Sequence, residues 1–158
     1  MNKGIIGALT GIVGAAAGAA VAGRVVGKNT EQYKMLSGKH FDLFMLMNQW
    51  VKVKQENKSI AEWLEKRGIH TVAIYGMNYV GETLLNELKG SNISVKYGID
   101  KNASQIYAEV DVYSPDETLE TVDAVIVTAI TYFDEISRNL ESKFECPILS
   151  IEDILYEV

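Results

Sequence analysis

Cysteine and proline are scarce in this sequence, whose 158 residues include 1 Cys and 2 Pro. A single cysteine excludes a disulfide-built secreted scaffold. No group of Cys and His has the spacing of a metal site. Hydrophobic residues make up 47% of the chain, which excludes a disordered polar chain and a collagen-like repeat. The length fits one domain with an attachment segment.

Positive charge is also limited, and it is unevenly placed. The formal net charge is -6, which argues against a nucleic-acid partner because phosphate contacts need clustered Lys and Arg. Residues 1–101 carry 13 Lys/Arg and 8 Asp/Glu, a net charge of +5, whereas residues 102–158 carry 2 and 13, a net charge of -11. The chain therefore has at least two physically different regions.

Residues 4–23 contain no charged side chain, and Thr10 is the only polar one. As a helix they would span about 30 Å, the thickness of a bilayer's hydrocarbon core. The glycines of this run step by 3, 4, 3 and 4 and so share one helical stripe, formed by Gly4, Gly7, Gly11, Gly14 and Gly18. A glycine stripe lets a second membrane helix approach closely. The run predicts a membrane anchor that also supports a homo-oligomer.

The basic residues near this run lie mainly after it, and they are Arg24, Lys28, Lys34 and Lys39, against Lys3 before it. The positive-inside tendency then predicts that the C-terminal domain is cytoplasmic. Two alternatives remain open. The run fits a secretory signal peptide cut after residues 20–22, and it also fits a small-residue helix packed in a soluble oligomer.

Three segments are therefore expected: an apolar Gly/Ala-rich anchor over residues 1–28, an amphipathic connecting helix over 29–56, and a folded domain over 57–158. In the connecting helix, apolar residues step by 3 and 4 as in a coiled-coil seam, formed by Tyr33, Leu36, His40, Leu43, Met47 and Trp50. The helix could equally lie on the following domain, and His40 is interpreted as a packed or interfacial histidine.

Residues 57–158 alternate between strand-like and helix-like patterns. A short helix is expected from the Ser59-x-x-Glu62 capping pattern to Gly68. Strands are expected over residues 71–75, 94–99, 110–113, 124–128 and 147–150. Further helices are expected over residues 79–89, from the Ser114-Pro115 start, over 132–144 and over 151–156. This order predicts an α/β fold with a doubly wound, parallel, five-stranded Rossmann-like sheet of order 3-2-1-4-5, preceded by N-terminal helices.

Ligands of such sheets bind at the carboxyl ends of the strands, where the strand order reverses. Here the first strand is followed by Gly76-x-Asn78-x-x-Gly81, the dinucleotide fingerprint with its middle glycine replaced. Asn tolerates left-handed backbone angles, which would preserve the turn, although its side chain crowds a pyrophosphate. Asp100 ends the second strand, where an acid accepts from the hydroxyls of an unphosphorylated ribose. The fourth strand brings Thr128 to the same crevice.

Three stretches carry a resemblance to a known family, and they are residues 73–82 (AIYGMNYVGE), 97–103 (YGIDKNA) and 122–128 (VDAVIVT). They resemble Rossmann-like domains of bacterial surface-polysaccharide systems, including the N-terminal nucleotide-sugar-binding domain of sugar O-acyltransferases. The resemblance covers residues 69–158. Gly76 matches the first glycine of the family's Gly-x-Gly turn, and Asp100 matches the acidic residue that ends the family's second strand. Asn78 stands where the family commonly has the second glycine. The resemblance implies a nucleotide-type ligand, with NAD or a nucleotide sugar as the cofactor class.

No catalytic constellation stands out. Tyr97-x-x-x-Lys101 has the letters of a dehydrogenase pair but spans a strand end, and Cys146 has no nearby His. The run Asp116, Glu117, Glu120 and Asp123 is interpreted as a solvated helix face.

Three hypotheses follow from the sequence. The first is a membrane-tethered cytoplasmic module that binds a nucleotide, nucleotide sugar or NAD and is accessory to cell-envelope polysaccharide biosynthesis. The second is a non-catalytic oligomerising scaffold with an empty crevice, and the third is an NAD-dependent sugar-modifying enzyme completed by a partner. The predicted binding residues are Gly76, Asn78, Tyr79, Gly81, Asp100 and Thr128.

Overall fold

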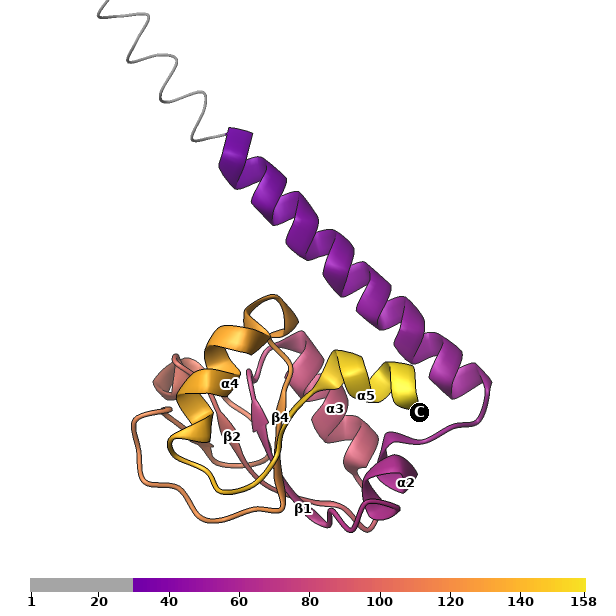
Figure 1. The fold of residues 1–158 in the computed structure, drawn as a ribbon, viewed down its shortest axis with the longest axis vertical. Coiled ribbons are helices and arrows are strands. Elements are labelled where there is room, and N and C mark those ends of the chain that lie inside the picture. The colour runs from indigo at the N-terminus through magenta and orange to yellow at the C-terminus, as the bar shows by residue number, and fades with distance from the viewer. Residues whose placement is uncertain (1–29) are drawn as a thin grey trace, which may run out of the picture. The chain divides into compact units, whose positions relative to one another are not determined.

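The computed structural model describes residues 30–158 (Figure 1). The predicted anchor, with the glycine stripe of residues 4–23, lies outside the described residues. The chain divides into two units between Leu43 and Phe44. Within residues 30–158, no helix combines the length and the apolar character that a membrane span requires.

Residues 30–55 are helical, and their last three turns belong to the second unit. In those turns Leu46, Trp50 and Val53 are at most 3% exposed and join the core of that unit. The amide of Gln49 donates to the carbonyl of Leu155 at 3.0 Å. Of the two alternatives for this helix, packing on the following domain is the one that the structure shows for residues 44–55. Its other face remains exposed, with Phe44 at 66% and Val51 at 52%.

Five strands form one sheet in the second unit, with the order β3-β2-β1-β4-β5. They are β1 (Thr71–Tyr75), β2 (Ser94–Ile99), β3 (Val112–Tyr113), β4 (Ala124–Val127) and β5 (Ile148–Ser150). All neighbouring strands pair in parallel. β1 and β4 are almost continuously apolar and buried, as strands covered on both faces must be. The predicted strand order and Rossmann-like fold are confirmed.

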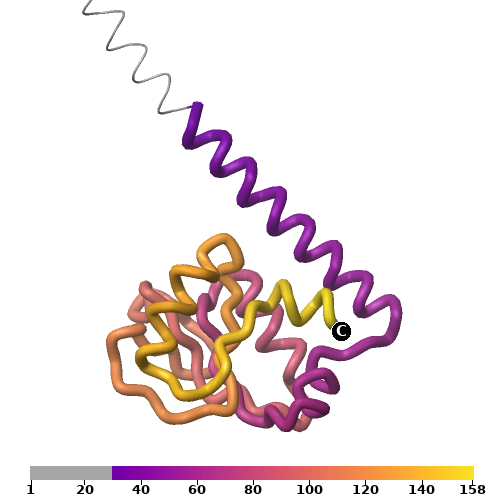
Figure 2. The backbone as a smooth tube through the Cα atoms, viewed as in Figure 1, coloured from indigo at the N-terminus to yellow at the C-terminus, as the bar shows by residue number. Residues whose placement is uncertain are grey.

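Helices cover both faces of this sheet (Figures 1 and 2). α2 (Ile60–Glu65), α3 (Tyr79–Leu88) and α5 (Ile151–Glu157) share one core with residues 44–55, whereas α4 (Phe133–Glu141) packs into a second core on the opposite face. Short 3₁₀ turns, η1 (Ala103–Gln105) and η2 (Ile130–Tyr132), follow β2 and β4. Ser59 caps α2 as predicted, accepting from the amide of Glu62 at 3.4 Å.

The helix expected from Ser114-Pro115 does not form, and this prediction was wrong. Ser114 and Glu117 make a single turn, in which the amide of Ser114 donates to the Glu117 carboxylate at 2.7 Å. The chain then runs to β4 without a helix. Residues 114–123 hold only Leu119 and Val122 as apolar side chains, so they offer no continuous stripe to bury. The acidic run therefore lies on an irregular connection instead of a helix face.

Asp123 ends this connection by joining it to the start of β1. Its carboxylate accepts from the amides of His70 at 2.9 Å and Thr71 at 2.7 Å. These two backbone hydrogen bonds, with a third from the Thr71 side chain, lower the pKa of the Asp123 carboxyl.

α3 crosses β1 at very close range because Gly81 has no side chain. A Cβ atom at Gly81 would lie 2.2 Å from the carbonyl oxygen of Gly76, far inside any real contact distance. The obstacle is backbone, so a flexible side chain cannot move to relieve it.

We expect Gly81→Ala to destabilise the domain by roughly 1–3 kcal/mol or more, because α3 must move away from β1. Urea unfolding of the full-length chain measures this. Gly38→Ala is the matched control, since Gly38 is also helical and has open space at its Cβ position. Its unfolding midpoint should stay constant or rise. Equal behaviour of the two variants would contradict the close packing.

Candidate functional site

A cavity of about 420 Å³ lies at the carboxyl ends of β1 and β2, beside the segment that follows β4. Residues from four parts of the chain line it: Tyr75, Gly76, Asn78, Asp100, Lys101, Asn102, Ala129, Tyr132, Glu135 and Ile136. Because β1 lies between β2 and β4, the strand order reverses at this point. The cavity, here named the crevice, therefore has the position at which ligands of open α/β sheets bind.

Three of the six predicted binding residues meet at the crevice, and they are Gly76, Asn78 and Asp100. Gly76 has a φ of +95°, a left-handed angle that favours glycine. A Cβ there would also lie 2.7 Å from the hydroxyl oxygen of Thr128. The backbone at this turn thus requires glycine on two independent grounds.

Asn78 takes a different role from the one expected of it. Its φ is -93°, so the turn does not use the tolerance of Asn for left-handed angles. Its side-chain oxygen instead accepts from the amide of Val80 at 3.1 Å and caps α3. Asn78 also lines the crevice, and its side-chain amide nitrogen is a hydrogen-bond donor.

Asp100 connects the end of β2 to the turn after β1. One carboxylate oxygen accepts from the amide of Met77 at 3.0 Å, and the other accepts from the amide of Asn102 at 2.8 Å. The Met77 amide belongs to the loop that would face a pyrophosphate in the dinucleotide fingerprint. Here the protein's own carboxylate takes that donor.

The other three predicted residues do not line the crevice. Tyr79 is 89% exposed at the first turn of α3. Gly81 is buried against the carbonyl of Gly76. Thr128 is 1% exposed, and its hydroxyl donates to the carbonyl of Tyr75 at 3.1 Å and to that of Gly76 at 2.5 Å. Gly81 and Thr128 therefore fix the turn through the carbonyl of Gly76 and do not line the ligand cavity.

Several crevice residues were not predicted from the sequence. Lys101 and Asn102 directly follow Asp100, and their position after a strand end could have predicted that they line the crevice. Tyr132 and Glu135 come from η2 and the first turn of α4, where the sequence predicted a helix over residues 132–144 and no binding residue. Tyr75 is the last residue of β1, where its apolar neighbours suggested only core packing.

The crevice has more negative than positive charge on its wall, with Asp100 and Glu135 against Lys101. Burial raises the pKa of the Tyr75 phenol, and Asp100, Glu135 and Asp116 raise it further through their charges. Tyr75 therefore keeps its proton at neutral pH. This wall suits a ligand that offers neutral hydroxyl groups better than it suits an anion placed beside Asp100.

The remaining candidate residues are not brought together. The Tyr97 hydroxyl donates to the carbonyl of Glu120, and burial raises its pKa to about 12. Tyr97 does not line the crevice that Lys101 borders, so the two do not form a dehydrogenase pair. Burial also raises the pKa of the half-buried Cys146 thiol. In residues 30–158, no cluster of His, Cys, Asp and Glu could hold a metal ion.

Comparisons with known proteins do not assign this chain to a family. Neither the scan against protein-family models nor the search of curated proteins gave a match. The function is therefore inferred from the crevice and its residues.

We expect Thr128→Val to lower the free energy of unfolding by about 1–3 kcal/mol, because the carbonyl of Gly76 loses its hydroxyl donor. The carbonyl of Tyr75 keeps the backbone amide of Thr128 as a donor. Urea unfolding measures this loss. Thr121→Val is the control, since Thr121 is exposed and its hydroxyl has no hydrogen bond in the part of the chain that the structure describes. A Thr128→Val variant as stable as the control would contradict the structural role given to this hydroxyl.

Proposed function

We propose that this chain is a Rossmann-like binding module for a ligand that contains a ribonucleoside, such as a nucleotide, a nucleotide sugar or NAD. The observation that carries the proposal is the position of Asp100 on the wall of the crevice, at the reversal of strand order, beside Asn78 and Lys101. The proposed contact is between the carboxylate of Asp100 and the two neighbouring hydroxyls of the ribose.

The hydrogen-bonding capacity of Asp100 supports this contact. An ionised carboxylate has about four lone-pair sites. The amides of Met77 and Asn102 take one site on each oxygen. One site on each oxygen is left, and Asp100 lines the crevice. Two adjacent hydroxyl donors match this arrangement, because they can bond to both oxygens at once. The amides also hold the carboxylate in place before the ligand arrives.

The size and the lining of the crevice agree with a small-molecule site. Ligand pockets have volumes of about 300–1,000 Å³ and combine apolar walls with a few polar groups. The crevice holds about 420 Å³. Its apolar lining includes Tyr75, Ala129 and Ile136, and its polar lining includes Asn78 and Asp100. A nucleoside is within this range of size.

The cellular setting is proposed from the sequence alone. The apolar run of residues 4–23 and the basic residues after it favour a membrane tether with the domain in the cytoplasm. The resemblance to domains of surface-polysaccharide systems favours an accessory role in the assembly of cell-envelope polysaccharides. The glycine stripe in the same run favours a homo-oligomer.

One observation favours a second candidate function, a scaffold whose crevice takes no ligand. The turn after β1 is already satisfied by the protein's own groups, since Asp100 accepts from Met77 and Asn78 accepts from Val80. A turn closed in this way is stable without a guest. The two candidates differ in one measurable property, which is stabilisation by a ribonucleoside.

Thermal unfolding of the full-length chain with adenosine, AMP, NAD or a UDP-sugar tests the proposal. At about 100 times its dissociation constant, a ligand should raise the free energy of unfolding by about 2.7 kcal/mol. Asp100→Asn should weaken binding by about tenfold to a hundredfold, since a hydrogen bond to a charged group contributes about 1.5–3 kcal/mol. The Asn side chain keeps the shape of Asp and can still accept from one of the two amides.

Asp111→Asn is the matched control, because Asp111 is exposed before β3 and lines none of the crevice. It should bind like the unaltered chain. If a folded chain shows no shift with any of these ligands at millimolar concentration, the scaffold is the function. If Asp100→Asn binds a ribonucleoside as tightly as the Asp111 control does, the contact with Asp100 is wrong.

A further inference from the structure

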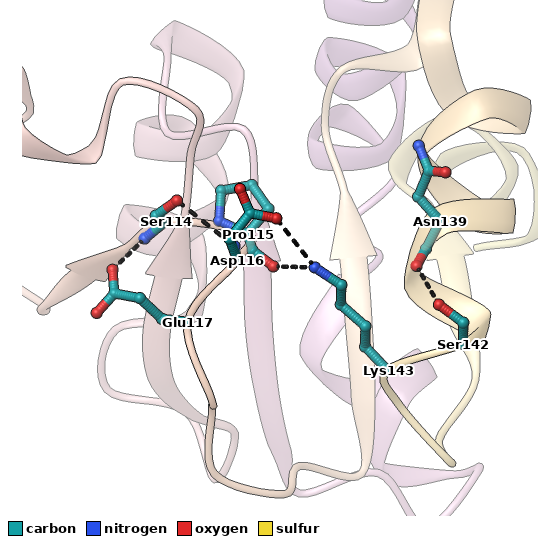
Figure 3. Close-up of polar contacts among 7 residues, drawn as sticks. All are labelled: Ser114, Pro115, Asp116, Glu117, Asn139, Ser142 and Lys143. Carbon is teal, nitrogen blue, oxygen red and sulfur yellow. Dashed lines mark hydrogen bonds and ion pairs between the residues drawn. The ribbon is translucent and has the colours of Figure 1, made fainter.

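A second cavity, of about 450 Å³, adjoins the crevice on the side of β3. Tyr75, Lys101 and Ile136 line both cavities, so the two adjoin at these side chains. The second cavity has its own walls in the turn after β3 and in the C-terminal half of α4. Figure 3 shows its polar residues, with Ser114, Pro115 and Asp116 on one side and Asn139, Ser142 and Lys143 on the other.

Lys143 bridges these two walls. Its ammonium group donates to the carbonyl of Pro115 at 2.5 Å and lies 3.3 Å from a carboxylate oxygen of Asp116 (Figure 3). The Asp116 side chain is 94% exposed, so most of its charge is screened by solvent. The space arises because no helix forms between β3 and β4, which leaves this part of the sheet face to a turn and to α4.

The charge on the walls changes sign along the two cavities. The crevice has Asp100 and Glu135, whereas the charged groups of the second cavity are Lys101, Lys143 and the largely exposed Asp116. Lys101 stands where the cavities meet, and within residues 30–158 it has no ion-pair partner. Its ammonium group is available to an anion that enters the second cavity.

We propose that the second cavity is a phosphate subsite for a ligand whose ribose is held by Asp100. The ligand class is then a ribonucleoside phosphate, with the sugar in the crevice and the phosphate between Lys101 and Lys143. Ser114, Asn139 and Ser142 supply neutral polar groups around that position. This inference rests on the proposed function, and it adds that the ligand extends from the crevice into the second cavity.

This direction differs from the one that the fingerprint suggests. A phosphate on the turn after β1 would need the Met77 amide, which donates to Asp100 instead, and it would approach the negative Asp100 carboxylate itself. Like charges at short range repel each other by several times the thermal energy in a partly buried site. The second cavity offers two ammonium groups and no buried carboxylate. The phosphate is therefore drawn away from the glycine turn.

Titration of the full-length chain with matched pairs of ligands tests the subsite. AMP should bind about tenfold to a hundredfold more tightly than adenosine, because the phosphate gains charge-assisted hydrogen bonds to lysine. Lys101→Met should remove most of that difference, measured as the ratio of the two affinities within the one variant. Methionine keeps the length of the lysine stem without its charge. Lys66→Met is the control, since Lys66 is exposed and lines neither cavity.

A second readout is the ³¹P resonance of AMP, which should shift on binding to the unaltered chain and to Lys66→Met but less on binding to Lys101→Met. Ribose 5-phosphate and inorganic phosphate show whether the sugar and the phosphate act together, and ribose 5-phosphate should bind more tightly than phosphate alone. Adenosine that binds as tightly as AMP overturns the subsite and leaves the ribonucleoside proposal standing. A Lys101→Met variant that keeps the full preference for AMP over adenosine also overturns it. A folded chain that binds none of these ligands removes both proposals.

Discussion

The carbonyl oxygen of Gly76 fixes the turn on which the candidate site is built. It accepts the Thr128 hydroxyl at 2.5 Å from the side of β4, and it leaves no room for a Cβ atom on Gly81 in α3. One backbone atom is thus confined between the neighbouring strand and the following helix. The positive φ of Gly76 completes this constraint, since most other residues would be strained at that angle. The turn is consequently held in one conformation before any ligand binds.

This turn determines where the acidic group of the crevice lies. Because the Met77 amide points toward the end of β2, the carboxylate of Asp100 is held at the crevice wall by backbone donors. A fixed carboxylate suits neutral hydroxyl donors and repels a nearby phosphate. The missing helix between β3 and β4 then opens a second cavity where two lysines gather. The proposed ligand follows from this separation of charge between two adjoining cavities, with the ribose in the more acidic one and the phosphate in the more basic one.

The sequence predicted the fold far better than it predicted the site. Strands with continuous apolar runs, such as residues 71–75 and 124–127, follow from local pattern, and the parallel order follows from the handedness of the crossovers. The glycines of the turn, Gly76 and Gly81, could also be predicted, because the backbone conformation and the close packing of such a turn require glycine. The role of Asn78 depends on which amide lies above it, and the second cavity depends on a helix that fails to form although Ser114-Pro115 resembles a helix start. Lys101 and Lys143 are 42 residues apart in the chain, so only the folded structure shows that they line one cavity.

Amide chemical shifts of the ¹⁵N-labelled full-length chain, recorded while AMP is added, test the central claim most directly. The claim is that the carboxylate of Asp100, already bonded to two amides, receives the ribose. New donors on that carboxylate weaken its existing hydrogen bonds, so the amide resonances of Met77 and Asn102 should move together and saturate at one AMP concentration. Shifts confined to other parts of the domain, with these two amides unmoved at saturation, would contradict the claim.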